Sequence, residues 1–266
     1  MFGTYFYHER IRKAVASFGA LFNDIYVLRK NSSGHTVSTM KVPLSYGPRA
    51  KFLDRIREQA NLTTDTKVAI KLPRMAFEIT NISYDPARQL PKVNNFNKAI
   101  EGTILNRNKI FTGVPYIISF QLSVFAKQQD DALQVVEQII PFFNPQYNLT
   151  IKPFSLYNDI KQDVPVTLTG VVLADDYEGP MEASRRTIQY TLDFDMQVYF
   201  HGPFSSQGII RKVDARLFDA NVGLGLGTDS DVPLERITTT PTPIGVSPDS
   251  DFGFSTTIVG IDSAEG

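Results

Sequence analysis

Apolar and polar residues alternate strictly along residues 185–200, and this is the clearest pattern in the chain. Every second residue from Ile188 to Phe200 is apolar, and Gln189, Asp193 and Asp195 are among the residues between them. Because successive side chains of a strand point to opposite faces, the pattern predicts a long strand with one buried and one wet face. One wet face is typical of an antiparallel sheet rather than of a parallel sheet covered on both sides.

A similar alternation predicts a second long strand over residues 114–127. Shorter strand patterns occupy residues 25–30, 36–46, 66–86, 164–176 and 208–219. Pro73 breaks the third of these, and Pro43 places its strand at a sheet edge, because proline cannot donate a ladder hydrogen bond. Within 66–86 the period of two predicts one face made of Met75, Phe77, Ile79 and Asn81, and another made of Ala76, Glu78, Thr80 and Ile82. Residues 87–113 have no clear period, which predicts a long connection.

Helical spacing of apolar residues predicts three helices. In the first, at residues 8–23, Ile11, Val15, Phe18 and Phe22 form the apolar stripe, and Arg10, Arg12 and Lys13 lie off it. These basic residues indicate a solvated face, with a basic patch for a partner as the alternative. The second helix follows Pro48 and buries Phe52, Leu53 and Ile56, and the third follows Asp131.

Paired carboxylates at Asp130 and Asp131 stand before the apolar stripe of the third helix, where they could form an active site or start the helix. One of them is placed to cap the helix, and Gln134 three residues after Asp131 resembles the far half of a capping box. Negative charge there also complements the helix dipole. Pro141 disfavours helix at Ile140 and ends the run. The pair is therefore interpreted as a helix start rather than as catalytic.

Together these elements predict an α+β fold with a mainly antiparallel or mixed sheet, helices packed on one face, and an extended C-terminal arm. The chain has 266 residues, of which 42% are hydrophobic, so it can bury the core of one elaborate domain or two small ones. It contains no cysteine, which excludes disulfides, thiolate metal sites and cysteine nucleophiles and is compatible with assembly in a reducing cytoplasm. A net charge of −1 favours neither a nucleic-acid binder nor a membrane-surface protein.

The composition changes after about Ala220. Residues 221–266 are rich in Gly, Pro, Thr and Ser and contain seven acidic residues and one basic residue, which gives this segment a charge near −6 and the rest of the chain a charge near +5. Such a segment buries too little apolar surface to order by itself, yet it keeps apolar anchors such as Phe252, Phe254 and Ile258. We therefore predict a domain at 1–219 and an acidic arm at 220–266 that lies on a neighbouring subunit or partner.

Motifs that carry chemistry are scarce. The three histidines, His8, His35 and His201, have neither HExxH nor HxH spacing, and "GLGLG" at 223–227 lacks the flanking elements of a phosphate loop. Asp193 and Asp195 share a wet strand face, which favours solvated or interface carboxylates over acid–base catalysis. No window approaches a membrane span, and the aromatic start of the chain does not have the order of a secretory leader. The expectation is a protein that is not an enzyme and has no catalytic residue, cofactor or metal site.

Several stretches, in order and spacing, resemble the tail sheath stabilisation and tail completion proteins of contractile-tailed bacteriophages. They are "MFGTYFYHERIRKAVASFGALFNDIYVLRK", "LPRMAFEITNISYDPARQL", "LSVFAKQQDDALQVVEQIIPFFNPQYNLT" and "ASRRTIQYTLDFDMQVYF", which together span Met1 to about Asp219. The third of these is the most specific. The segment after Ala220 is the least alike.

This resemblance implies a structural virion protein that forms a hexameric ring at the head-proximal end of the tail. The implied partners are further copies of the chain, the tail sheath, the tube-terminating ring and the neck or head-completion proteins, with no cofactor, membrane or specific nucleic acid. The implied location is the tail–neck junction of the virion, after assembly in the host cytoplasm. A ring repeats the same two patches around a rotation axis, and an edge strand and an arm with anchors can supply them.

Three other interpretations stay open. The chain could be another phage ring module, either tube-terminating or head-completing, and co-purification with sheath would separate these from a sheath stabiliser. It could also be the cap of a related contractile injection system, which differs mainly in its genomic neighbourhood. An enzyme of unrecognised type would need a polar cluster within a pocket, and no such cluster is visible in the sequence.

Overall fold

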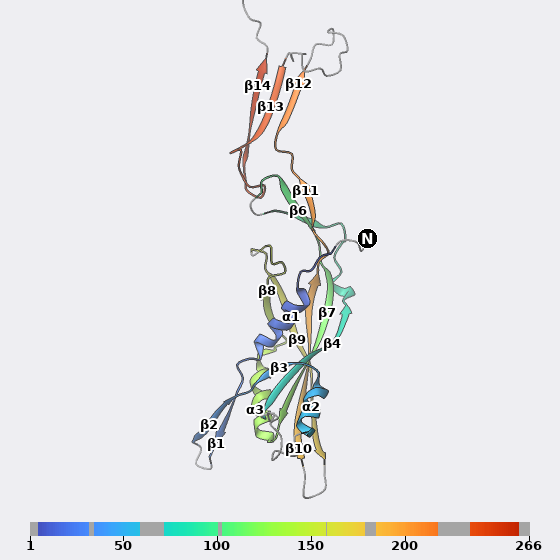
Figure 1. The fold of residues 1–266 in the computed structure, drawn as a ribbon, viewed down its shortest axis with the longest axis vertical. Coiled ribbons are helices and arrows are strands. Elements are labelled where there is room, and N and C mark those ends of the chain that lie inside the picture. Colours follow the sequence, from blue (N-terminus) through green and yellow to red (C-terminus); the bar gives the residue numbers. More distant parts are fainter. Residues whose placement is uncertain are drawn as a thin grey trace, which may run out of the picture. The chain divides into compact units, whose positions relative to one another are not determined.

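The chain forms two compact units in the computed structural model, which describes residues 5–31, 35–58, 72–100, 103–157, 159–178, 185–217 and 235–260 (Figure 1). We call residues 6–90 and 113–200 the core unit, and residues 1–5, 91–112 and 201–266 the strand unit. The chain thus leaves the core unit after Leu90, returns at Gly113 and leaves again after Phe200. The predicted boundary between residues 219 and 220 lies outside the described residues, so the division into domain and arm stays a prediction.

A six-stranded mixed sheet is the centre of the core unit. Its spatial order is β3 (Leu44–Tyr46), β4 (Arg74–Tyr84), β7 (Val114–Ala126), β10 (Arg185–Phe200), β9 (Gln162–Glu178) and β8 (Gln146–Ile151). All neighbours are antiparallel except β3 and β4, which are parallel. The predicted α+β class with a mainly antiparallel, mixed sheet is confirmed, as are the two long strands β7 and β10.

The core lies between one face of this sheet and two helices, α1 (Arg10–Leu21) and α3 (Gln129–Ile139). Phe18 of α1 is fully buried, and its ring stacks on Phe120 of β7 at a centroid distance of 4.3 Å. Gly19 allows α1 to approach the sheet closely, since a Cβ atom there would stand 2.9 Å from the ring of Phe77. The alternating apolar residues of β10 complete this core, as their period predicts.

The buried face of α1 differs from the predicted stripe. Phe18 and Phe22 are buried as predicted, but Ile11 is exposed and Arg10 is buried. The Arg10 guanidinium donates to the backbone oxygen of Tyr199 at 3.1 Å and to the Gln162 side chain at 2.5 Å, and burial lowers its pKa to about 10. Fixed acceptors on β9 and β10 thus allow a charged residue to be buried at a position where periodicity alone predicts exposure.

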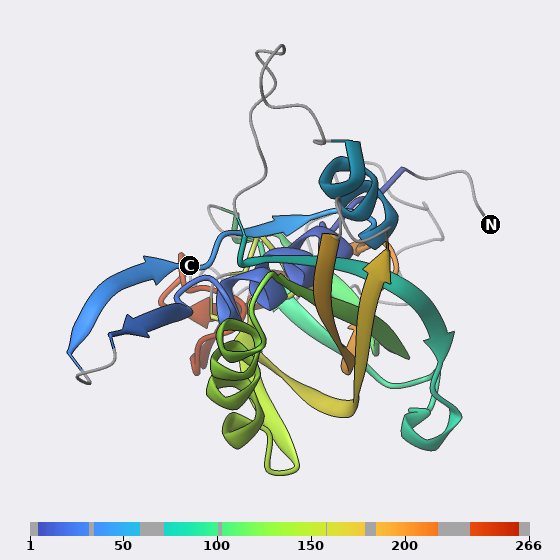
Figure 2. The same ribbon diagram turned by 90° about the horizontal axis from the view of Figure 1, so that it is seen from below.

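The helix α2 (Arg49–Glu58) lies on the opposite face of the sheet, so only α1 and α3 follow the prediction that the helices share one face. Phe52 of α2 packs with Ala76 and Phe125, whose neighbours in sequence, Met75 and Val124, belong to the main core. Figure 2 shows α2 and α3 on opposite sides of the strands. Gln189 lies on the face of β10 that the sequence predicts to be wet. It is only 2% exposed, so this face is buried under α2.

A β-bulge in β4 corrects the predicted faces of this strand. The register with β7 shifts between Ile79 and Asn81, so that Ile79 lies opposite Phe120 and Ile82 lies opposite Ile118. The extra residue moves every later side chain to the other face. Ile82 therefore continues the face of Met75, Phe77 and Ile79, and Asn81 leaves it, which reverses the prediction for both residues.

The predicted hairpin forms from β1 (Tyr26–Lys30) and β2 (Thr36–Lys41) as a separate two-stranded sheet. Pro43 lies outside the strands, and its backbone oxygen accepts the N–H of Met75 at 2.9 Å. The chain then continues into β3, which joins the main sheet rather than the hairpin. The helix α3 ends at Ile139 and is followed by the 3-10 turn η2 (Ile140–Phe142), as expected from Pro141.

The described residues of the strand unit form two three-stranded sheets. One has the order β11 (Ser205–Gly208), β6 (Asn106–Phe111), β5 (Asn95–Ala99), and the other has the order β12 (Val213–Leu217), β13 (Glu235–Thr242), β14 (Gly253–Gly260). The prediction that residues 87–113 form a long connection is wrong. These residues contain the strands β5 and β6 and the end of the 3-10 turn η1 (Pro86–Arg88). Their polar sequence has no clear period of two, although Asn108 and Ile110 on one face of β6 are buried.

Candidate functional site

The helix α3 fixes the β1–β2 hairpin through two glutamines that replace a neighbouring strand. The side chain of Gln134 accepts the Leu28 N–H at 2.9 Å and donates to the Leu28 backbone oxygen at 3.0 Å. One turn later, Gln138 donates to the backbone oxygen of Tyr26 at 2.8 Å. An unpaired strand edge presents such backbone groups, so the glutamines satisfy the side of β1 that faces away from β2.

An ion pair between the exposed Arg29 and the buried Asp131 reinforces this contact and corrects the predicted helix cap. The N-cap residue of α3 is Gln128, without a side-chain cap bond, so the predicted cap at Asp130 or Asp131 and the capping box with Gln134 are wrong. Asp131 is 1% exposed and accepts from Arg29 of β1 at 2.6 Å. The carboxylate raises the pKa of the Arg29 guanidinium by this hydrogen bond. Asp131 therefore points toward Arg29, a partner distant in the sequence that residue spacing does not reveal.

The variant Gln134→Ala should loosen the hairpin while the helix stays folded. It removes both bonds to Leu28, and a partly solvated bond contributes about 1 kcal/mol. Hydrogen–deuterium exchange should show the Leu28 amide exchanging at least about fivefold faster. Glu137→Ala is the control, since Glu137 is an exposed residue of the same helix. Equal exchange in both variants would show that the glutamine does not hold β1.

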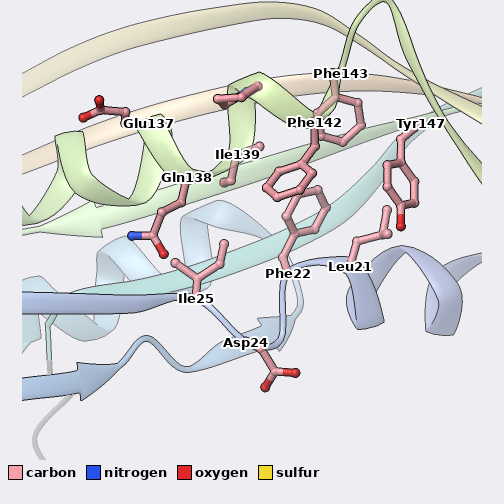
Figure 3. Close-up of a pocket in the computed structure, with 11 residues that line it drawn as sticks. Leu21, Phe22, Asp24, Ile25, Glu137, Gln138, Ile139, Phe142, Phe143 and Tyr147 are labelled. Carbon is pink, nitrogen blue, oxygen red and sulfur yellow. The ribbon is translucent and has the colours of Figure 1, made fainter.

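An apolar pocket of about 590 Å³ opens where the last turns of α1 and α3 meet (Figure 3). Its apolar lining includes Leu21, Phe22 and Ile25 from one side and Ile139, Phe142 and Phe143 from the other. Figure 3 shows the rings of Phe22 and Phe142 pointing toward one another. Phe142 is 67% exposed, which is a high value for a phenylalanine. Because the apolar part of the lining is large and the ionisable groups, Asp24 and Glu137, lie at its rim, this pocket suits an apolar side chain of a partner better than a reaction.

The outer part of β9 is a second exposed apolar feature of the core unit. The strand β8 pairs with residues 162–167 of β9, and from Leu168 onward no strand of the described chain pairs with that edge. Val171, Val172 and Leu173 follow on this edge, and all three are exposed. Natural proteins usually protect exposed edge strands with charges, proline or short length. Asp175, Asp176 and Glu178 supply charge at the end of β9, whereas Val171–Leu173 have none and fit a contact with another protein.

The strand unit has almost no hydrophobic core of its own. Among its described residues, Ile110 is the one large hydrophobic side chain that is buried. Polar contacts hold the loop after β13 to the β5–β6 hairpin instead: Asp249 accepts the Ala99 N–H at 2.9 Å and pairs with Lys98 at 3.4 Å. Arg211 donates to the backbone oxygens of Ile104 and Ile244 at 2.8 and 3.1 Å, and also to that of Val246.

We expect Arg211→Met to lower the stability of the strand unit by about 1.5–3 kcal/mol, because hydrogen bonds from a charged donor contribute about that much and three carbonyls lose their partner. Denaturant unfolding, followed by hydrogen exchange in residues 104–110 and 243–250, measures this. Lys212→Met is the matched control, since Lys212 only approaches Asp214 at 3.9 Å. If both variants unfold alike, the Arg211 contacts do not hold the unit together.

The sheet β12–β13–β14 has one mainly apolar and one polar face, and the mainly apolar face also contains Glu235, Thr239 and Thr256. The register places Ala215, Ile237 and Ile258 in one row across the sheet, and Val213, Leu217, Pro241 and Phe254 share their face. The other face has Asp214, which binds Arg236 at 2.9 Å, and several threonines. Arg236 holds the pKa of Asp214 below its usual range, so this face stays charged. Phe254 and Ile258 are 70% and 61% exposed. A sheet with this pattern normally packs its apolar face on something else.

The residues considered for catalysis lie in ordinary structural surroundings. Asp193 accepts a hydrogen bond from Gln121 at 2.9 Å and Asp195 accepts one from Ser119 at 2.7 Å, all on the sheet face that α2 leaves open. His8 packs edge-on against Phe154, and 223–227 lies outside the described residues. In the part of the chain that the structure describes, no three His, Asp or Glu residues gather as metal ligands. No helix there is long and apolar enough to span a membrane.

Comparison with known proteins gives the family. The family described as T4-like virus Myoviridae tail sheath stabiliser matches residues 5–259, which is nearly the whole chain. The chain belongs to this family. It is also 28% identical over 227 residues to tail completion protein gp15 of Enterobacteria phage T4, covering 79% of this chain and 77% of that protein. As a tail sheath stabiliser, it is a structural component of a phage virion's tail.

For a member of the tail sheath stabiliser family, the relevant sites are contact surfaces, and the sequence indicates only some of them. The C-terminal anchors Phe254 and Ile258 stand out in the sequence and lie together on the apolar sheet face. Gln134 and Gln138 read as outer residues of their helix, although their i, i+4 spacing is a signal for a shared face. Val171 to Leu173 are recognisable as a strand, but not as an open edge, since pairing partners are set by the tertiary structure.

Proposed function

We propose that this chain forms a hexameric ring at the head-proximal end of a contractile tail. The ring caps the last sheath disc, meets the tube-terminating ring and provides the surface to which neck and head-completion proteins attach. Assembly takes place in the host cytoplasm, and the finished protein lies at the tail–neck junction of the virion. It has no catalytic residue and no cofactor.

The uncovered apolar face of β12–β13–β14 carries this proposal. A three-stranded sheet with large apolar side chains exposed, and with no core beneath it among the described residues, is poorly suited to an isolated monomer. Its four most telling side chains, Val213, Leu217, Phe254 and Ile258, are all at least 50% exposed. Family membership supports the location in the tail, and the resemblance of the sequence to tail completion proteins supports the ring.

Two more surfaces fit contacts with different partners. The apolar pocket around Phe142 and the open edge at Val171–Leu173 both belong to the core unit but involve different elements. A ring uses two distinct patches for its own closure, and a cap between sheath and neck needs others as well. Several separate apolar surfaces on one chain are therefore expected for a protein that joins assemblies.

Mass measurement of the purified full chain, alone and with tails, tests the proposal. Native mass spectrometry should give six copies per ring, either in solution or after incubation with tails that lack the protein. Electron micrographs should show the added ring at the head-proximal end, and sheath should co-purify with it. A chain that stays strictly monomeric and never binds tails would contradict the proposal, and binding to tube or head without sheath would favour a different ring module.

A further inference from the structure

We infer that neighbouring copies of this chain join edge to edge through β12 of one copy and β14 of the next. The inference rests on the proposed ring and names the contact that closes it. Within the described residues, β13 is the central strand and pairs on both sides, whereas β12 and β14 each pair only with β13. The outer edges of β12 and β14 thus have no partner strand in the described part of the chain, and they belong to the same small sheet.

The edge of β14 is suited to strand addition. All eight residues of "GFSTTIVG" are exposed, and none of them is charged or proline. Such an edge is a template for another strand, and proteins that stay monomeric normally block it with lysine, proline or a bulge. No register shift interrupts the pairing of β14 with β13, so the strand is regular along its whole length.

The directions of the strands select the partner. Both β12 and β14 are antiparallel to β13, so they run in the same direction. A rotation about an axis along the strands therefore brings β14 of one copy beside β12 of the next as a parallel pair. One such contact, repeated head to tail, closes a ring, whereas pairing β14 with β14 makes only an isologous dimer.

The side chains agree with this arrangement. Rotation about such an axis keeps the apolar faces of all copies on the same side of the ring wall, so Val213 and Leu217 of one copy continue the surface of Phe254 and Ile258 in its neighbour. On the opposite face, β14 presents Ser255, Thr257 and Val259 beside Asp214 and Arg216 of the next β12. No like charges meet, because β14 has no charged residue.

The absence of cysteine from the chain allows a direct test by disulfide formation. In the double variant Ala215→Cys with Ile258→Cys, both thiols lie on the apolar face, one on each edge. Within a single copy, β13 separates them by two strand spacings, roughly 10 Å, which exceeds the reach of a disulfide of about 7 Å between Cα atoms. A second pair, Ala215→Cys with Thr256→Cys, covers the alternative register.

Rings or completed tails made with at least one of these double variants should give a ladder of covalent oligomers after oxidation, up to the full ring. Each single variant should stay uncrosslinked. A dimer from Ile258→Cys alone would mean β14–β14 pairing, and a dimer from Ala215→Cys alone would mean β12–β12 pairing, and either would overturn the inference. Reduced samples must still form rings, which checks that the variants fold.

The failure of this contact is distinguishable from the failure of the proposed function. If the unmodified chain forms rings but neither double variant crosslinks within them, then the ring exists and this contact is wrong. If the unmodified chain never forms rings and never binds tails, then the proposed function itself fails.

Discussion

Replacing Phe18 with alanine should lower the free energy of unfolding of the core unit by about 3–5 kcal/mol, the range for removing a buried aromatic side chain. Phe18 is fully buried and stacks on Phe120 at 4.3 Å. Its ring also lies 5.0–5.4 Å from those of Phe22, Phe77 and Phe194. The cavity would therefore lie at the meeting point of α1, β4, β7 and β10, where four aromatic rings are constrained by one another and cannot readily close it.

Urea unfolding measures this effect. The chain has no tryptophan but 11 tyrosines, so tyrosine fluorescence and far-ultraviolet circular dichroism are the suitable signals. Phe142→Ala is the matched control, because the same chemical change at a residue that is 67% exposed should alter stability by roughly 0.5 kcal/mol or less. A loss below about 1 kcal/mol for Phe18→Ala would contradict the described core.

The double variant Phe254→Asp with Ile258→Asp should reduce the fraction of tails that carry this protein by well over tenfold. Both side chains lie on the apolar face of β12–β13–β14 and are mostly exposed in the single chain. If this face is covered in the assembled tail, each carboxylate would be buried without a partner, and losses of about 2 kcal/mol or more per central residue are usual at interfaces. The core unit contains neither residue, so its unfolding should be unchanged.

The control places the same two negative charges on the polar face of the central strand β13, away from both open edges. Thr240→Asp with Thr242→Asp does this, since these residues lie opposite Ser255 and Gly253. Electron micrographs and phage yield should show this variant near the level of the unmodified chain. Equal defects in the two variants would mean that added charge on this sheet matters rather than the apolar face, and no defect in either would mean that this face stays open in the tail.

The contact surfaces divide naturally between the two units. The core unit has a dense aromatic interior and presents its pocket and open edge on a stable base. The strand unit is held by polar contacts such as those of Arg211 and Asp249. Segments that bury little surface alone order most strongly when a partner covers them, so the strand unit is suited to forming its final packing during tail assembly.

Features that depend on local periodicity are visible in the amino-acid sequence. The alternation along β7 and β10 predicted two long strands and their core-facing residues, and the spacing of Phe18 and Phe22 predicted the buried side of α1 in part. The order and spacing of several segments along the chain indicated the family. Each of these signals lies within about twenty residues or in a simple order of segments, so the sequence displays it directly.

Features that depend on partners distant in the sequence become visible in the three-dimensional fold. One extra residue in β4 exchanged the faces of Asn81 and Ile82. Arg29 turned the buried Asp131 into half of an ion pair, and Gln134 and Gln138 became the lateral partners of β1. The weakly patterned residues 95–99, 106–111, 235–242 and 253–260 became strands, because pairing with neighbours supplied the order that their own hydrophobicity lacks. A strand edge or an apolar face is open or covered only in three dimensions, and this is why the surfaces that suit a tail protein were the part that local patterns could not reveal.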